Sequence, residues 1–344
     1  MNGRPRSSTE EHRSSKPQVA RSSRAGGTVA LLIVLALSAC AAPEADPVWE
    51  RTGPAVAPDL LPDLPRFVTE GTVAGADFDP YSVYPLIDVA AIPIDSTGRA
   101  VWRDRKGVRH NHPVSFAQYA IYALIEYEAT GDPVWLDRAV SNATALIEIH
   151  VERDGAWWYP YPFNWTYYER TLTAPWWSGM AQGHALSLFV RLGELQPDNP
   201  AWGDAADHTF RSFTQAPSAT EPWSTIVIGG SLWFEEYAGN QPPLQVLNGH
   251  VFAMFGVHDY WRVTGDPVAA ELLTGSAATV LEMMPLIREP GGPSYYCAQV
   301  DYCRSPDWQN VNYHPIHVWQ LESLAVIVGV PEFAEWSALL DEDF

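Results

Sequence analysis

The chain has 344 residues, of which 47% are hydrophobic and 18% are charged, and its formal net charge is −20. This hydrophobic fraction excludes a wholly disordered chain and is sufficient for a large core. The acidic excess excludes a nucleic-acid-binding protein, because phosphate contacts require a basic surface.

Residues 1–39 have the pattern of an export signal. Their basic residues precede a short apolar run at 29–37, which is too short to span a bilayer. Residues 37–40 (LSAC) resemble a bacterial lipobox, which implies cleavage before Cys40 and lipidation of its sulfur. We expect an extracytoplasmic, membrane-anchored lipoprotein with a flexible linker at 40–65. An ordinary signal peptide with an incidental cysteine is the alternative.

Residues 66–110 predict a short extended lead-in. Residues 88–95 (DVAAIPID) and 99–102 (RAVW) flank the turn sequence Ser-Thr-Gly, which predicts a β-hairpin. Four basic residues follow, and a solvated charged turn is their default interpretation: Arg103, Arg105, Lys106 and Arg109.

Helical periodicity dominates from about residue 113 to the C-terminus. Eight predicted helices fall into four pairs, and each pair is joined by a short polar turn with proline at its end or at the start of the next helix. The predicted ranges are 113–129, 133–152, 176–195, 200–215, 246–264, 267–286, 313–328 and 331–341. This internal repeat of helical hairpins predicts a mainly α fold, with a domain at 111–344.

Three long connections separate the pairs, at about 153–175, 216–245 and 287–312, and they are rich in aromatic residues. Long loops in a compact domain are usually functional. If the four hairpins close into a toroid, these connections share one end with four helix N-termini. Such an end is a place for a carboxylate.

Two cysteines remain if Cys40 carries lipid. In an oxidising compartment, Cys297 and Cys303 predict a disulfide that closes a small loop. A metal site is the weaker alternative, because further ligands at zinc-like spacing are missing.

Five segments resemble, in order and approximate spacing, the C-terminal catalytic domain of the D-glucuronyl C5-epimerases. The motifs WSGMAQG, EEY, VLNG and YHxxH are specific as a set, and the resemblance covers about 105–344. It implies an (α/α) barrel of four hairpins and inversion at carbon 5 of glucuronate units in a polysaccharide, usually heparosan, to give iduronate. The segments are 111–132, 175–192, 233–237, 246–259 and 313–324.

Epimerisation needs two proton-transfer groups, one on each face of the sugar, and stabilisation of an enediolate. By the resemblance, Glu236 and Tyr237 match the family's catalytic pair, Tyr313 matches the YH motif, and Tyr296 matches a further active-site tyrosine. Tyr295 is an off-by-one alternative to Tyr296. We expect Glu236 and Tyr313 to be the opposed groups, with Tyr237 and Tyr296 as support.

Further residues within or beside these segments are candidates for substrate binding, and each also has a structural interpretation. The alternatives are packing, a helix cap at Asn248, core or metal-binding histidines, and a solvated basic turn. The candidates are Trp177, Gln182, Asn248, His314, His317, Arg105 and Arg109. The chain departs from the family after Tyr296, where family members carry Asp and often a basic residue and this chain has Cys297-Ala298-Gln299.

The predicted reaction needs no redox cofactor, and we expect neither a metal nor a nucleic-acid partner. The sequence leaves the oligomeric state open. Three rival functions are a polysaccharide lyase, a uronyl hydrolase that uses paired carboxylates, and a non-catalytic glycan-binding lipoprotein.

Overall fold

The computed structural model describes Leu64 and residues 67–167, 170–219 and 222–344. The export signal, Cys40 and nearly all of the linker lie outside the described residues, so those predictions stay predictions.

The described part of the chain is mainly helical, and all eight predicted helices are present within a few residues of their expected ends. A short helix, α7 (Val300–Cys303), lies in the third connection and was not predicted. The others are α1 (Pro113–Thr130), α2 (Pro133–Ile149), α3 (Gly179–Leu195), α4 (Pro200–Arg211), α5 (Leu247–Thr264), α6 (Pro267–Ile287), α8 (His314–Val328) and α9 (Glu332–Asp343).

Two of the interhelical turns have the same sequence, Thr-Gly-Asp-Pro, at 130–133 and 264–267, and they fold in the same way. Gly131 and Gly265 end α1 and α5 at φ 69° and φ 62°, a left-handed conformation that favours glycine. The aspartate that follows caps the next helix by accepting a backbone N–H, and proline occupies the first helical turn. Local chemistry therefore sets these helix ends.

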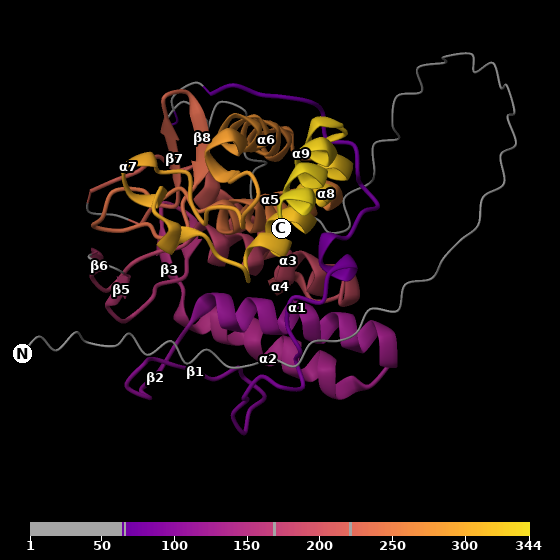
Figure 1. The fold of residues 1–344 in the computed structure, drawn as a ribbon. Helices are drawn as coiled ribbons and strands as arrows, with labels where there is room; N and C mark the ends of the chain where they lie inside the picture. Colours follow the sequence, from indigo (N-terminus) through magenta and orange to yellow (C-terminus); the bar gives the residue numbers. More distant parts are fainter. Residues whose placement is uncertain (1–63, 65–66, 168–169, 220–221) are drawn as a thin grey trace, which may run out of the picture. The chain divides into compact units, whose positions relative to one another are not determined.

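The helices form an inner row and an outer row. α1 packs against α3, α3 against α5 and α5 against α8, while α2, α4, α6 and α9 each pack on the preceding inner helix of their hairpin. α3 and α5 approach closely where Gly183 faces Ala253 and Gly256 faces the Gly183 backbone, since a Cβ at either glycine would overlap its neighbour. Figure 1 shows the four hairpins.

The lead-in bridges the first and last inner helices. Tyr122 on α1 donates a hydrogen bond to the Tyr84 carbonyl over 2.8 Å, and the Tyr84 ring stacks on Trp319 of α8 with centroids 4.9 Å apart. The predicted lead-in therefore packs against both ends of the inner row of helices.

The predicted hairpin at 88–102 is reduced to a single bridge between Ile94 and Ala100. The Val101 N–H donates to the Pro93 carbonyl over 2.8 Å, but proline has no N–H to return the bond, so the ladder stops there. The strands that do form lie next along the chain, β1 (Trp102–Arg103) and β2 (Arg109–His110).

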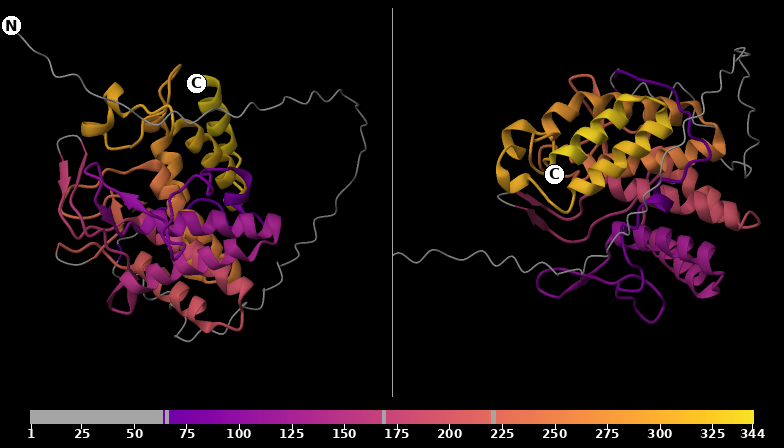
Figure 2. Two further views of the ribbon diagram at one scale, coloured as in Figure 1. Left: turned by 90° about the horizontal axis from the view of Figure 1, so that it is seen from below. Right: turned by 45° about the vertical axis from the view of Figure 1, so that its right-hand side comes forward.

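Two of the three long connections contain antiparallel hairpins, where the sequence had indicated only loops. Figures 1 and 2 show β1–β2 and β5–β6 on the same side of the helices, away from the α1–α2 turn. The hairpins are β3 (Val151–Arg153) with β4 (Ala156–Trp158), β5 (Trp165–Tyr167) with β6 (Arg170–Leu172), and β7 (Thr225–Ile228) with β8 (Ser231–Phe234).

Among the described helices, α6 is long and apolar enough to cross a membrane by length and composition. More than half of the relevant window is buried inside the protein, and α6 packs against α5 and β8. These contacts identify α6 as a core helix within the four helical hairpins.

Candidate active site

A fully buried carboxylate, Glu235, organises the loop that follows β8. Its Oε1 accepts the Tyr237 N–H over 3.0 Å, and its Oε2 accepts the N–H groups of Leu244 and Gln245 over 3.0 and 2.9 Å. Burial raises the pKa of Glu235, and these backbone donors oppose the rise. Glu235 is assigned no role from the sequence, yet its contacts fix the conformation of the loop that carries Glu236 and Tyr237.

The neighbouring carboxylate, Glu236, lies against the first turn of α5. A Cβ at Gly249 would overlap with Glu236 Oε2, so glycine is required for this approach. α5 starts without a side-chain cap, and its N-terminal dipole favours an ionised carboxylate. Burial is the larger effect and raises the pKa of Glu236 to about 8.

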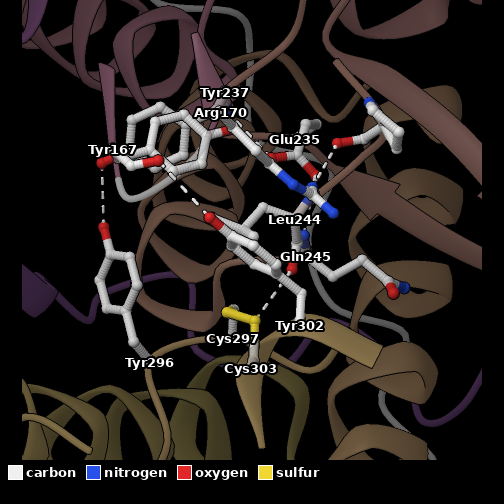
Figure 3. The surroundings of a disulfide bond; sticks show 11 residues. Tyr167, Arg170, Glu235, Tyr237, Leu244, Gln245, Tyr296, Cys297, Tyr302 and Cys303 are labelled. Atoms are coloured by element: carbon white, nitrogen blue, oxygen red, sulfur yellow. Dashed lines mark hydrogen bonds between the residues drawn. A yellow bond between two sulfur atoms is a disulfide. The ribbon is translucent and has the colours of Figure 1, made fainter. Parts of the chain in front are cut away.

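The three predicted tyrosines gather at this carboxylate from three separate segments. The Tyr296 hydroxyl donates to Glu236 Oε1 over 3.3 Å and lies 3.2 Å from the Tyr237 hydroxyl. The Tyr313 ring meets the Tyr296 ring edge-on, with centroids 4.7 Å apart. Figure 3 shows the hydroxyls of Tyr237 and Tyr296 facing each other.

Tyr296, which we expect to support the reaction, is the tyrosine whose hydroxyl is bonded to Glu236. The off-by-one alternative is wrong, because the Tyr295 ring packs under the Arg304 guanidinium, 5.0 Å from its centroid. Burial, reinforced by the nearby Glu236, raises the pKa of Tyr237 and Tyr296 well above 10, which keeps both hydroxyls protonated in the resting site.

A disulfide joins Cys297 to Cys303, with Cα atoms 5.6 Å apart. It ties α7 to the strand-like segment that carries Tyr296 (Figure 3). The same segment pairs with the start of α5, since the Ala298 N–H donates to the Gln245 carbonyl over 2.9 Å. The third connection is therefore held on both sides of Tyr296.

His314 and His317 converge on Ser294, two residues before Tyr296. The Ser294 hydroxyl lies 3.0 Å from His314 Nδ1 and 2.8 Å from His317 Nδ1, and His314 Nε2 lies 3.0 Å from the Leu340 carbonyl. His314 thus supports the connection, and its surroundings correct the prediction that it contacts substrate. Burial lowers the pKa of His317 to about 3, so it is neutral.

No group of three metal-ligating side chains occurs in the described part of the chain. His317 Nε2 has no hydrogen-bond partner among the described atoms, so substrate contact by this residue stays a prediction.

Gln182 has a structural role that corrects its predicted contact with substrate. Its Oε1 accepts the Tyr159 N–H over 3.1 Å, and its Nε2 donates to the Trp157 carbonyl and the Ser212 hydroxyl, both over 2.8 Å. With both ends of the buried amide engaged, Gln182 joins the first long connection to the 3-10 turn Ser212–Thr214 that follows α4.

Trp177 and Asn248 lie beside the loop that carries Glu236 and Tyr237. The Trp177 backbone pairs with Ala238, just after Tyr237, over 2.8 and 3.0 Å, and its ring packs edge-on against Trp158. The cap alternative for Asn248 is wrong, because Val246 occupies the N-cap position. Asn248 is buried, and its Oδ1 has no partner among the described atoms, so it stays a candidate for substrate binding.

The two arginines of the lead-in that we predict to bind substrate differ in their contacts. Arg105 lies over the Trp165 ring, 6.0 Å from its centroid, whereas Arg109 is ion-paired with Asp95. The Arg109 side chain is therefore bound within the lead-in segment. Arg170 is not predicted from the sequence. Its guanidinium stacks over the Tyr302 ring, 3.9 Å from the ring centroid.

Comparison with known proteins gives sequence matches of two kinds, to a family model and to curated proteins. A family model described as D-glucuronyl C5-epimerase C-terminus matches residues 152–339, more than half of the chain. D-glucuronyl C5-epimerase from Caenorhabditis elegans is 27% identical over 173 residues, which are 46% of this chain and 27% of that protein. The match therefore spans about a quarter of the length of this curated relative.

Among solved structures, D-mannose isomerase is similar with a TM-score of 0.51 and 10% identity, over 78% of this chain and 69% of that chain. Cellobiose 2-epimerase from Spirochaeta thermophila DSM 6192 has a TM-score of 0.46 and 11% identity, over 84% and 66%. At such low identity, the likeness to D-mannose isomerase concerns the fold alone.

Proposed function

The chain belongs to the D-glucuronyl C5-epimerase C-terminus family, and we propose that it inverts carbon 5 of D-glucuronate units within a polysaccharide to give L-iduronate. The observation that carries the proposal is the buried Glu236 bonded to Tyr296, with Tyr237 and Tyr313 packed around the pair. Carboxyl and phenol groups are the proton-transfer groups that this reaction requires.

In the proposed mechanism, one group takes the proton from carbon 5, and the electron pair of that bond moves toward the substrate carboxylate to form an enediolate. A second group then returns a proton to the opposite face of carbon 5. No bond to the ring oxygen or to the 4-substituent breaks. We assign these two roles to Glu236 and Tyr313, and we leave open which of the two acts first.

The surroundings of Glu236 suit such a role. A carboxylate with a pKa of about 8 is a stronger base than an ordinary carboxylate. General acid–base catalysis is most effective when the pKa of the proton-transfer group lies near the working pH. The protonated hydroxyls of Tyr237 and Tyr296 are donors that can stabilise charge on the enediolate.

The deciding experiment is incubation with glucuronate polymers, heparosan first, in heavy water. We expect deuterium at carbon 5 and new iduronate, with the chain length unchanged. An unsaturated, ultraviolet-absorbing product would identify a lyase, shortened saturated chains would identify a hydrolase, and binding without exchange would identify a glycan-binding protein.

Single-atom changes test the assignment. Tyr313→Phe removes one hydroxyl and Glu236→Gln replaces one carboxylate oxygen, so the fold should persist. Each should lower carbon-5 exchange by about 10²- to 10⁴-fold. An exchange rate equal to that of the wild type in either variant would overturn that residue's role.

We also propose that the protein is exported and anchored through lipid on Cys40. The support for this proposal is the basic segment, the short apolar run and the lipobox-like LSAC at 37–40.

A further inference from the structure

The hairpin β5–β6 links the catalytic cluster to the basic turn. Trp165 and Tyr167 are two residues apart on β5, so they share one face of the strand, and both are half-buried. The Tyr167 ring contacts the Tyr237 ring with centroids 5.2 Å apart. At the other end of β5, the Trp165 ring meets Trp102 with centroids 6.3 Å apart.

The two ends of this face lie at a spacing suited to a sugar chain. Residues i and i+2 of a strand are about 7 Å apart, which is comparable with the length of a sugar residue. A sugar held at Glu236 next to Tyr237 would therefore have its neighbour near Trp165. The flat face of an indole is a large, rigid surface for the apolar side of a sugar ring.

Two arginines lie along the same hairpin. Arg105 lies over the Trp165 ring, and Arg170 is paired with Tyr167 in the register of β5 and β6. Within the residues described, neither has an acidic partner, whereas nearby Arg99 and Arg109 are ion-paired with Glu148 and Asp95. Arg105 is exposed and can meet an external anion, although the chain as a whole carries a net charge of −20. Arg170 is half-buried and also donates to the Pro242 carbonyl over 3.3 Å.

From these contacts we propose that Trp165 and Arg105 form a flanking subsite that binds the sugar next to the reacting unit of a uronate polymer. The indole stacks on the sugar ring, and the guanidinium pairs with a polymer carboxylate. Arg170, opposite Tyr167 on the same hairpin, adds a second positive charge nearer to the reacting unit. This inference rests on the proposed function for the identity of its ligand.

The test compares polymer with short substrate. Carbon-5 exchange is measured for Trp165→Ala, Trp165→Phe and Arg105→Gln on heparosan and on the shortest oligosaccharide that the wild type accepts. We expect the ratio of kcat/KM for polymer to that for the short substrate to fall about tenfold in Trp165→Ala and in Arg105→Gln. Trp165→Phe should retain part of the ratio, because it keeps an aromatic face.

The chain offers a matched control on α2, where the Arg138 guanidinium lies 4.7 Å from the centroid of Trp135. Trp135 is half-buried as Trp165 is, whereas Arg138 is half-buried and Arg105 is exposed. The pair lies on α2, which carries none of the proposed proton-transfer residues. Trp135→Ala and Arg138→Gln should leave the ratio unchanged. An equal fall in these controls, or an unchanged ratio in the Trp165 and Arg105 variants, would overturn the subsite.

Equilibrium binding separates this inference from the proposed function. In a Glu236→Gln background, where turnover is removed, heparosan should bind about tenfold more weakly when Arg105→Gln is added, and the loss should shrink at high salt. If the wild type binds heparosan through Arg105 but exchanges no proton, the epimerase proposal fails and the subsite stands. If the wild type exchanges carbon 5 and Arg105→Gln does not weaken binding, only the subsite fails.

Discussion

The Tyr296 hydroxyl donates a hydrogen bond to Glu236 Oε1 over 3.3 Å, across a separation of 60 residues in the chain. Glu236 belongs to the second long connection, and Tyr296 belongs to the third. The site is therefore assembled by packing one connection on the other. The first four predictions below depend on this contact or on the elements that hold it.

The first prediction concerns the contact itself. Tyr296→Phe should lower carbon-5 exchange by about 10²-fold or more and should move the rising limb of the pH–rate profile to higher pH. The shift follows because the Tyr296 hydrogen bond lowers the pKa of Glu236. Tyr295→Phe is the matched control, since Tyr295 faces Arg304, and it should leave both quantities nearly unchanged. Loss of activity without a shift of the profile would contradict this account.

The second prediction concerns pH and stability. Burial raises the pKa of Glu236 from its ordinary value to about 8, so the folded state binds this proton more tightly than the unfolded state does. The contribution of Glu236 to stability should therefore be lost as the pH rises from about 4.5 to 8. The free energy of unfolding in urea, measured for the wild type and for Glu236→Gln between pH 5 and pH 9, tests this prediction. The Gln variant should become more stable relative to the wild type as the pH approaches 9. A constant difference would show that the carboxyl titrates normally.

The third prediction concerns Gly249. Gly249→Ala places a methyl group where Glu236 Oε2 lies, which should displace the carboxylate and sharply reduce carbon-5 exchange. Overpacking of this kind costs about 1–3 kcal/mol in stability. A double-mutant cycle with Glu236→Ala is the control, because Gly249→Ala should cost less once the overlaps with Oε2 and Cδ are removed and only the overlap with the retained Cβ is left. Additive stability losses in the cycle would mean that the two residues do not compete for space.

The fourth prediction concerns the bridge between Cys297 and Cys303. Closing so short a loop contributes at most about 2–3 kcal/mol in the chain-entropy model. Replacing both cysteines by serine should therefore leave the fold intact and reduce carbon-5 exchange, because the bridge holds the segment that carries Tyr296. Activity equal to that of the wild type in the double-serine variant would contradict this role, as would two free thiols in the mass spectrum of the non-reduced protein.

The fifth prediction concerns anchoring at Cys40. Cys40→Ala should yield unprocessed or unlipidated protein that separates from the membrane fraction or retains residues 1–39. Mass spectrometry of the N-terminal peptide provides the measurement. An unmodified Cys40 in membrane-retained wild-type protein would refute the anchor.

The helices were predictable because their ends are set by neighbouring residues. The Thr-Gly-Asp-Pro turns at 130–133 and 264–267 contain a residue suited to a left-handed turn, a cap and a helix-starting proline within four positions. The hairpins β3–β4, β5–β6 and β7–β8 were not predictable in the same way. Their strands have three or four residues, too few for a clear alternating pattern, and they are stabilised by packing on helices distant in the chain.

By itself, the sequence determined the four helical hairpins, because caps and hydrophobic periodicity are local properties. The candidate site residues came from motifs that resemble those of a known family. Only the tertiary structure decided which of those residues meet. Tyr296 bonds Glu236, and the absence of a side chain at Gly249 leaves space for that carboxylate. Glu235 binds the backbone of the loop. Gln182 and His314 have structural contacts. Burial raised the pKa of Glu236 to about 8. Burial and hydrogen bonding depend on which distant segments pack together, and no spacing along the chain encodes that.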